Sequence, residues 1–197
     1  MSFRTEKKAL LNLQNKSLIN ELIDSKNFEI IFKERIIKSI YFDTLNFDCF
    51  FQSDEGVVPR KKFRIRSYKN SNDKNFYYEK KISSLEGRYK ETSSISINDV
   101  NKFIKNGIYD QDYGYIFPIL NVQYKRKYFK YKSWRITLDE DIKYSNFINQ
   151  HYVHDTSNVI EFKSFYEKSE DELIFNFPLN FSRFSKYCNG IRMLGIL

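Results

Sequence analysis

Alanine, glycine, proline and cysteine are scarce in this chain. Its 197 residues include 6 glycines, 3 prolines, 2 cysteines and one alanine, Ala9. The glycines form neither a Walker loop nor a dinucleotide-binding fingerprint, so the usual backbone cradles for phosphate are excluded. Any phosphate that binds must therefore be held by side chains, and arginine does this with paired hydrogen bonds.

Cys49 and Cys188 lie far apart in the sequence, each among aromatic residues. This setting predicts two buried, reduced thiols of a cytoplasmic protein, with a disulfide as the other interpretation. No stretch approaches the roughly 20 apolar residues of a spanning helix, and the first residues lack the apolar core of a signal peptide. We therefore expect one cytoplasmic domain over residues 1–197, without a membrane segment.

Aromatic residues and positive charge are abundant. The 15 tyrosines and 19 phenylalanines, with almost no alanine, favour strands over a helical bundle. The 33 Lys and Arg residues exceed the 25 Asp and Glu residues, which gives a net charge of +8. This excess suggests an anionic partner such as nucleic acid, phosphates or a membrane surface, although a coding bias would produce part of it.

Four helices are predicted from capping residues and apolar spacing. Glycine is expected just beyond a helix end, and acidic residues are expected in a first turn. The signals are Asn12 before a helix over Leu13–Asp24; Ser96 with Asp99 before Val100, ending at Gly107; Ser169 before Glu170, Asp171 and Glu172; and Phe181, Phe184 and Cys188, with Gly190 past the end.

Most other segments alternate charged and apolar residues with a period of two, which is typical of strands. One interpretation is an antiparallel sheet with a solvated face and a core face. The other is a barrel whose charged faces converge on a lumen, with helices covering the apolar faces. The charged positions are rich in arginine and carboxylates, which favours the barrel. The alternating positions are Arg4, Glu6 and Lys8; Lys62, Arg64 and Arg66; Glu79 and Lys81; Tyr124 and Arg126; Arg135, Thr137, Asp139 and Asp141; and Glu161 and Lys163.

A lumen lined by arginine and lysine requires an anion, because like charges repel strongly in a poorly solvated site. Carboxylates interleaved with those basic residues are expected when a divalent cation binds as well. A triphosphate together with a metal ion satisfies both requirements.

Eight short motifs follow one another along nearly the whole chain. They are Arg4-x-Glu6-x-Lys8, Ser39-Ile-Tyr-Phe-Asp43-Thr44, Lys62-Phe-Arg64-Ile-Arg66-Ser-Tyr68, Glu79-Lys80-Lys81, Tyr124-Lys-Arg126, Arg135-Ile-Thr137-Leu-Asp139, Ile160-Glu161-Phe-Lys163 and Phe184-Ser185-Lys186-Tyr187. In these motifs and their order the chain resembles the VTC (vacuolar transporter chaperone) domain, the catalytic module of polyphosphate polymerases and a member of the triphosphate tunnel metalloenzymes.

The resemblance implies an α+β fold, in which an antiparallel barrel of about eight strands encloses a basic tunnel. Helices are expected outside the barrel, with a C-terminal helix near one tunnel end. The implied reaction transfers the γ-phosphate of ATP to a growing polyphosphate chain with Mn²⁺ or Mg²⁺ bound. Catalytic roles are implied for Arg64, Arg66, Arg126, Arg135 and Lys186. Phosphate contacts are implied for these five and for Lys8, Lys62, Lys81, Arg88, Lys90, Tyr124, Lys163 and Ser185. Metal ligation is implied for Glu161 first, and then for Glu6, Asp139 and Glu79.

Two other functions stay open. The related hydrolases and cyclases resemble one another in an N-terminal Glu-x-Glu-x-Lys, whose paired carboxylates help to hold metal. Arg4 stands at the first of these positions, which argues against a hydrolase of triphosphate or short polyphosphate without excluding it. The remaining alternative is a non-catalytic module that binds polyphosphate or inositol phosphates.

Two further patterns are less informative. His151 and His154 lack Cys or carboxylate partners at the spacing of a zinc site. The basic segment from Arg60 to Arg66 is compatible with a nucleic-acid patch, but its alternation suits a phosphate site equally well. We expect ATP and polyphosphate as partners and no nucleic acid, and we expect Trp134 to be packing bulk.

Overall fold

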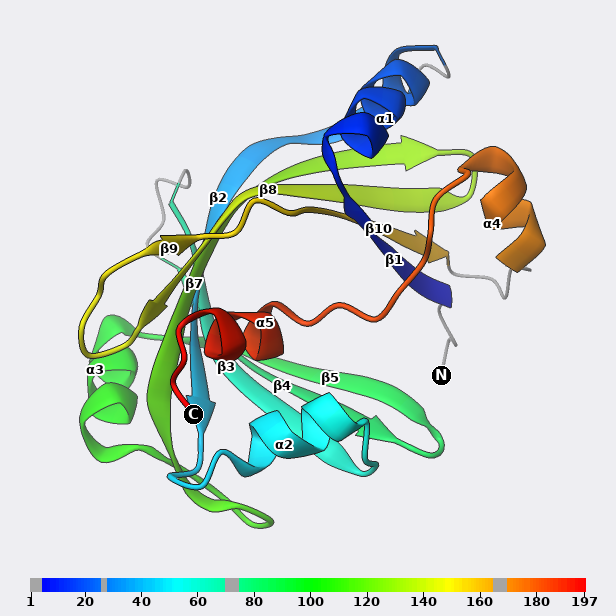
Figure 1. Cartoon of the computed structure of the whole chain (residues 1–197). Helices are drawn as coiled ribbons and strands as arrows, with labels where there is room; N and C mark the ends of the chain where they lie inside the picture. The colour runs from blue at the N-terminus through cyan, green and yellow to red at the C-terminus, as the bar shows by residue number, and fades with distance from the viewer. Residues whose placement is uncertain (1–4, 26–27, 70–74, 165–169) are drawn as a thin grey trace. The chain divides into compact units, whose positions relative to one another are not determined.

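The structure is a computed structural model that describes residues 5–25, 28–69, 75–164 and 170–197 (Figure 1). Arg4 and Ser169, which the sequence singled out, lie outside these ranges. Within them the strands are β1 (Thr5–Leu11), β2 (Glu29–Asp43), β3 (Arg60–Tyr68), β4 (Phe76–Ser84), β5 (Gly87–Ile95), β6 (Ile108–Asp110), β7 (Gly114–Tyr131), β8 (Trp134–Asn146), β9 (Val153–His154) and β10 (Asn158–Ser164). The helices are α1 (Leu13–Ser25), α2 (Asp48–Glu55), α3 (Ile97–Asn106), α4 (Glu170–Asn176) and α5 (Lys186–Met193).

The strands form one sheet. Its order is β1-β10-β8-β7-β2-β3-β4-β5, with β6 beside β7 and β9 beside β8. The pairs β1·β10, β10·β8, β2·β3, β3·β4 and β4·β5 are all antiparallel. The predicted α+β class, with an antiparallel path of eight strands and accompanying helices, is confirmed.

Contacts divide the chain into two units. Unit 1 contains residues 1–35, 124–142 and 155–184, and unit 2 contains residues 36–123, 143–154 and 185–197. The long strands β2, β7 and β8 contribute their two halves to different units. The prediction of a single domain over residues 1–197 stays a prediction.

Unit 1 has an apolar core between its strands and helices α1 and α4. Ile136 and Phe162 are fully buried on the strands, where they meet Ile19 of α1, Leu173 of α4 and Phe177 just after that helix. Trp134 is also buried and packs edge-on against Phe162, with the ring centroids 6.4 Å apart. The prediction that Trp134 serves as packing bulk is confirmed.

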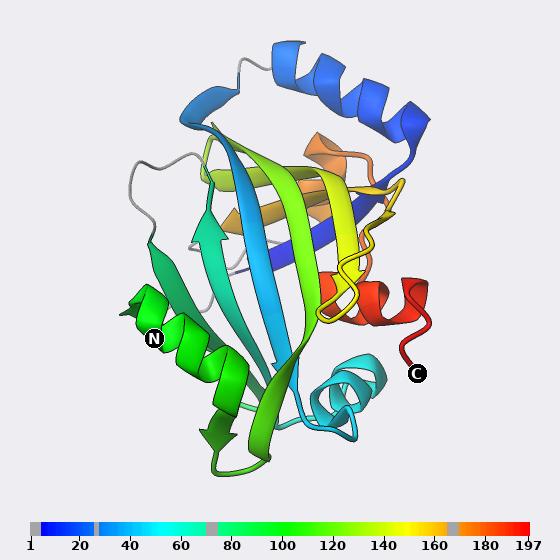
Figure 2. The same ribbon diagram turned by 90° about the vertical axis from the view of Figure 1, so that its left-hand side faces the viewer.

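Unit 2 has a second apolar core, which α3 covers. Phe63 and Ile65 of β3 are buried against Val100 of α3, and Phe103 of the same helix packs against this cluster. Figure 2 shows α3 lying against β3 and β4. In each unit, therefore, the apolar residues of the strands face helices, as the alternation predicted. The charged positions that alternate with them lie on the opposite side of the strands.

The predicted starts of α1 and α3 are confirmed. The amide of Asn15 donates to Oδ1 of Asn12 at 2.8 Å, so Asn12 caps α1. Ser96 and Asp99 form a reciprocal capping box at the start of α3. That helix ends at Gly107, whose φ of 76° is one that glycine adopts without strain.

The predicted helix around Phe181 and Phe184 is wrong in its start and its end. Phe181 forms an isolated antiparallel bridge with Ala9, and the amide of Ser182 donates to the Lys8 carbonyl at 2.8 Å. The chain is therefore extended along β1 there and becomes helical only at Lys186. Gly190 lies inside α5 and does not end it. A glycine is needed there because a Cβ would come within 2.6 Å of the Tyr144 ring.

The predicted alternation along β8 is wrong at Asp141. The residue has a φ of 50°, and its carboxylate lies 2.9 Å from Nζ of Lys125. Because Lys125 stands between Tyr124 and Arg126 on β7, its side chain points to the opposite face. The left-handed residue thus shifts the register, and Asp141 leaves the face that Asp139 occupies.

Both cysteines are buried and unpaired, as predicted. In the part of the chain that the structure describes, no helix has the length and apolar character needed to cross a membrane.

Ser96→Ala should lower the free energy of unfolding by about 1 kcal/mol, because α3 loses its N-cap acceptor. Thermal unfolding monitored by circular dichroism measures this. Ser93→Ala, on the exposed part of β5, is the matched control and should leave the melting temperature unchanged. An equal shift in both variants would contradict the capping role.

Candidate functional site

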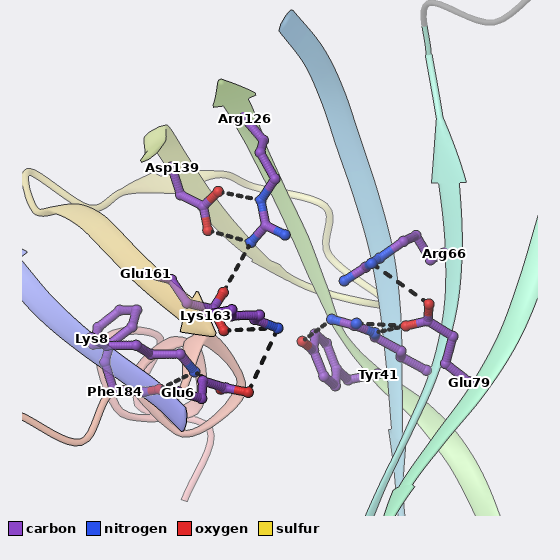
Figure 3. Close-up of polar contacts among 11 residues, drawn as sticks. Glu6, Lys8, Tyr41, Arg66, Glu79, Arg126, Asp139, Glu161, Lys163 and Phe184 are labelled. Carbon is purple, nitrogen blue, oxygen red and sulfur yellow. Dashed lines mark hydrogen bonds and ion pairs between the residues drawn. The ribbon is translucent and has the colours of Figure 1, made fainter. Parts of the chain in front are cut away.

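A cluster of charged side chains lies on one face of the unit 1 strands; we call it the carboxylate cluster (Figure 3). Lys8 of β1 is in register with Glu161 of β10, and Glu6 is in register with Lys163. The ammonium of Lys163 lies 3.1 Å from the Glu161 carboxylate and 3.6 Å from that of Glu6. Lys8 lies 3.3 Å from Glu6 and donates to the carbonyl of Phe184 at 3.3 Å. The members of this cluster are Glu6, Lys8, Arg126, Asp139, Glu161 and Lys163.

Arg126 is fixed by Asp139 within this cluster. Its Nε and Nη2 donate to the two carboxylate oxygens of Asp139 at 2.5 and 2.7 Å, a bidentate pairing that sets the plane of the guanidinium. Nη2 also lies 3.9 Å from Glu161, and the guanidinium stands 5.2 Å from the centre of the Tyr124 ring. Burial alone would lower the pKa of Arg126, but the Asp139 carboxylate holds it well above its usual value.

Glu161 is buried and remains ionised. Burial would raise the pKa of its carboxyl group, but Lys8, Lys163 and Arg126 hold that pKa well below its usual range. The same pairing raises the pKa of Lys8, because Glu161 and Glu6 outweigh the opposing effect of its burial. Charge in this cluster is therefore retained by mutual pairing.

The donor set of the carboxylate cluster fits a hard divalent cation. Glu6 and Glu161 both lie within ion-pair distance of the Lys163 ammonium, so two carboxylates stand beside the same cation. Thr137 is in register with Glu161, and its buried Oγ1 has no hydrogen-bond partner. Oxygen ligands of this kind suit Mg²⁺ and Mn²⁺. Among the described residues no three His, Cys, Asp or Glu side chains are grouped to hold a metal, so a bound ion would need further oxygen ligands.

A second cluster lies on unit 2; we call it the basic cluster, and Figure 3 shows Arg66 and Glu79 of it. Its centre is Glu79 of β4, which is 4% exposed. Arg64 reaches this carboxylate at 2.5 Å, Lys90 at 2.6 Å and Arg66 at 3.6 Å. Burial would raise the pKa of Glu79, but Arg64 and Arg66, with Lys90, lower it to about 2. The members of this cluster are Lys62, Arg64, Arg66, Glu79, Lys81 and Lys90.

Three lysines of the basic cluster stand in one cross-strand row. Lys62 of β3 is in register with Lys81 of β4, and Lys81 is in register with Lys90 of β5. Like charges directly opposite one another destabilise a sheet, so this row favours an anion over it. Nζ of Lys62 also donates to Oγ of Ser185 at 3.0 Å.

Lys186 belongs to the same surroundings. Burial would raise the pKa of Tyr41, but the positive charges of Arg64, Arg66 and Lys186 lower it overall. Ser185 therefore contacts the basic cluster through Lys62, and Lys186 follows it as the first residue of α5.

The remaining predicted residues lie at the margins. Arg135 is in register with Lys163 and is exposed, and Arg88 is exposed two residues before Lys90. His151 and His154 are exposed as well. The assignments of individual catalytic, phosphate-binding and metal-binding roles stay predictions.

Tyr41 is a site residue that sequence reasoning missed. It is in register with Arg64, and its hydroxyl accepts a hydrogen bond from Nη1 of Arg64 at 3.1 Å. Its position between Ser39 and Asp43, with the period of a strand, was a usable signal.

The low pKa of Glu79 predicts a pH dependence of stability. Its pKa falls from 4.5 to about 2, so its contribution to stability is complete above 4.5 and is lost as the pH falls toward about 2. Glu79→Gln should therefore reduce the pH dependence of the unfolding free energy in this interval, measured by urea unfolding at several pH values. Glu91→Gln, whose carboxylate is exposed, is the control and should leave the dependence unchanged. The same slope in Glu79→Gln and the parent chain would contradict this pairing.

Comparison with known proteins identifies relatives of this fold. A protein of Pyrococcus horikoshii OT3 matches with a TM-score of 0.63 and 17% identity, covering 97% of this chain and 99% of that one. An adenylate cyclase candidate of Bacillus halodurans matches with a TM-score of 0.63 and 16% identity over 98% of both chains. An adenylyl cyclase candidate of Hippeastrum with a dominant triphosphatase activity matches with a TM-score of 0.58 and 14% identity, covering 98% of this chain and 97% of that one.

These identities are low, so the structural matches show the fold alone. No curated protein sequence matches the chain. The model of the VTC domain family, in contrast, matches residues 3–195. With nearly its whole length covered by that model, the chain belongs to the VTC domain family.

Proposed function

We propose that this protein is a metal-dependent phosphotransferase that moves the γ-phosphate of ATP to the end of a polyphosphate chain. The observation that carries the proposal is the composition of the basic cluster. Five basic side chains, Lys62, Arg64, Arg66, Lys81 and Lys90, gather around or beside the single carboxylate of Glu79. Such an excess of positive charge on one strand face is best balanced by a polyanion.

The two clusters differ in charge balance, and this difference supports a division of roles. The carboxylate cluster pairs Lys8, Arg126 and Lys163 with Glu6, Asp139 and Glu161, so its charges are equal in number. The basic cluster has no such balance. We infer that phosphate oxygens contact Arg64, Arg66 and the lysine row.

Metal binding is proposed for Glu161 and Glu6. Tunnel-fold enzymes depend on a divalent metal, and these two adjacent carboxylates have the appropriate oxygen donors. A bound Mn²⁺ or Mg²⁺ would neutralise part of the phosphate charge. Glu79 contacts three basic side chains, which favours a role in holding those side chains over one in holding metal.

Phosphate transfer in such a site needs positioning and charge stabilisation more than proton transfer. A terminal phosphate is largely ionised near neutral pH, because its second pKa is about 6, so it needs no general base. The main barrier is repulsion between two anions. Arg64 and Arg66, held by Glu79, provide fixed cations that would stabilise the transition state without reorganising.

Hydrolysis of triphosphate or short polyphosphate is the second candidate. The adjacent carboxylates Glu6 and Glu161 favour it, because paired carboxylates could orient a metal and water. The dominant triphosphatase activity reported for the Hippeastrum protein of the same fold also makes it reasonable to test. Arg4, where the hydrolases have a glutamate, argues against it.

We also propose that the protein works in a reducing compartment such as the cytoplasm. Cys49 and Cys188 are both buried as free thiols, which is typical of such a compartment.

Arg64→Ala should weaken the binding of inorganic tripolyphosphate by about 1.5–3 kcal/mol, the range for hydrogen bonds to charged groups. Isothermal titration calorimetry at constant salt measures the change. His151→Ala, at an exposed position outside both clusters, is the control and should leave the affinity unaltered. Equal losses in the two variants would place the phosphate site elsewhere.

The purified chain, incubated with ATP and Mn²⁺, should produce ADP and an acid-labile phosphate polymer. Glu161→Gln should abolish the polymer, because the neutral amide binds a divalent cation poorly. Glu91→Gln, an isosteric change at an exposed carboxylate, should leave the yield unchanged. Gel electrophoresis of the polymer and chromatography of the nucleotides measure both products.

The product distribution separates the candidate functions. Free phosphate without polymer would establish the hydrolase in place of the polymerase. Tight tripolyphosphate binding without turnover of ATP would indicate the non-catalytic binding module.

A further inference from the structure

Asp43, the last residue of β2, is fully buried and accepts three backbone hydrogen bonds. The donors are the amides of Thr44 at 2.7 Å and of Cys49 and Phe50, both at 2.9 Å. Cys49 and Phe50 lie in the first turn of α2, where amide groups lack partners inside the helix. Phe47, at the N-cap position, provides no side-chain acceptor. Asp43 therefore caps α2 from the strand, and its negative charge suits that end of the helix.

Tyr187 of α5 donates its hydroxyl to the same carboxylate. Its ring also stacks on Tyr41, with the centroids 5.2 Å apart and the planes at 18°. Asp43 and Tyr41 stand two residues apart on one strand, so they share a face and contact Tyr187 at its hydroxyl and its ring. Burial and the charge of Asp43 raise the pKa of Tyr187, so its hydroxyl stays a donor.

The residues that precede Tyr187 belong to the proposed phosphate site. Ser185 caps α5 by accepting from the amide of Cys188 at 3.4 Å, and it also accepts from Lys62. Lys186 is close enough to Tyr41 to lower its pKa. Ser185 is the N-cap of α5 and Lys186 is its first residue, so the docking of this helix fixes where both residues lie.

Other contacts hold the far part of α5. Asn189 donates to the hydroxyl of Tyr144 at 3.3 Å, and Gly190 allows the helix backbone to approach that same ring. Arg192, near the C-terminal end, forms an ion pair with Asp54 of α2. Tyr187 is the residue of α5 that combines a buried hydrogen bond with a stacked ring immediately beside Ser185 and Lys186.

We propose that the Asp43–Tyr187 hydrogen bond is the positioning element that sets Ser185 and Lys186 against the basic cluster. The inference rests on the proposed function, since it requires Lys186 to contact the phosphate chain. Asp43 and Tyr187 act through other residues and touch no substrate. Tyr41 extends the arrangement to Arg64 by accepting its hydrogen bond. The buried carboxylate of Asp43 thus caps α2, holds α5 through Tyr187 and thereby positions Lys186.

A double-mutant cycle on the full chain tests this role, with inorganic tripolyphosphate as the probe in isothermal titration calorimetry. Lys186→Ala should weaken binding about 10-fold in the parent chain, the low end for a hydrogen bond to a charged group. In the Tyr187→Phe background the same change should weaken binding less than about 2-fold, because Lys186 would already have lost its fixed position. Tyr187→Phe retains the ring and its stacking. Tyr109→Phe, at an exposed tyrosine, is the matched control and should preserve the 10-fold effect.

A purely structural role for Tyr187 would change the melting temperature and leave the effect of Lys186→Ala intact. That result overturns the positioning role and leaves the proposed function standing. No effect of Lys186→Ala in the parent chain overturns the inference together with the assignment of Lys186 to the phosphate site. Should Tyr187→Phe fail to fold, Asp43→Ala, which removes the carboxylate that accepts from Tyr187, supplies the second background. It should abolish the Lys186 effect in the same way, and a retained 10-fold effect there overturns the proposal.

Discussion

Buried charge in this structure must be compensated, and the bidentate pair between Arg126 and Asp139 shows this constraint most clearly. Both groups are mostly removed from solvent, with 14% and 1% of their side chains exposed. Loss of one partner from such a pair costs about 3–5 kcal/mol, because the other charge is left buried and uncompensated. A carboxylate buried on the strands therefore needs a cation in reach, as Asp139 has, or several hydrogen-bond donors, as Asp43 has. Apolar residues of the same strands fill the opposite face and pack under α1, α3 and α4.

The two clusters differ in composition: three basic and three acidic residues form the carboxylate cluster, whereas five basic residues and Glu79 form the basic cluster. Glu161 is matched by basic neighbours, whereas Glu79 is outnumbered by them. The lysine row beside Glu79 is a cost to the unliganded sheet. A bound polyphosphate would remove that cost. The features that make the basic cluster a poor stabiliser of the fold are thus those on which the proposed phosphate site depends.

A short C-terminal helix extends the basic cluster with two residues from the end of the chain. An eight-residue helix has little stability by itself, so tertiary contacts must hold α5 in place. Asp43 contributes to this while it also caps α2, and Gly190 permits close packing against Tyr144. The positions of Ser185 and Lys186 consequently depend on the buried contacts that hold α5.

The sequence by itself determined the two faces of the strands, the caps of α1 and α3 and the identity of the charged residues, since these follow from local periodicity and capping chemistry. Alternation placed Arg64 and Arg66 on one face, and the structure adds that both meet Glu79. Tertiary structure alone decided the start of α5, the register shift at Asp141 and the meeting of Asp43 with Tyr187, which lie 144 positions apart. Such contacts are absent from a local pattern, because they form only when distant strands and helices pack and bury the same groups.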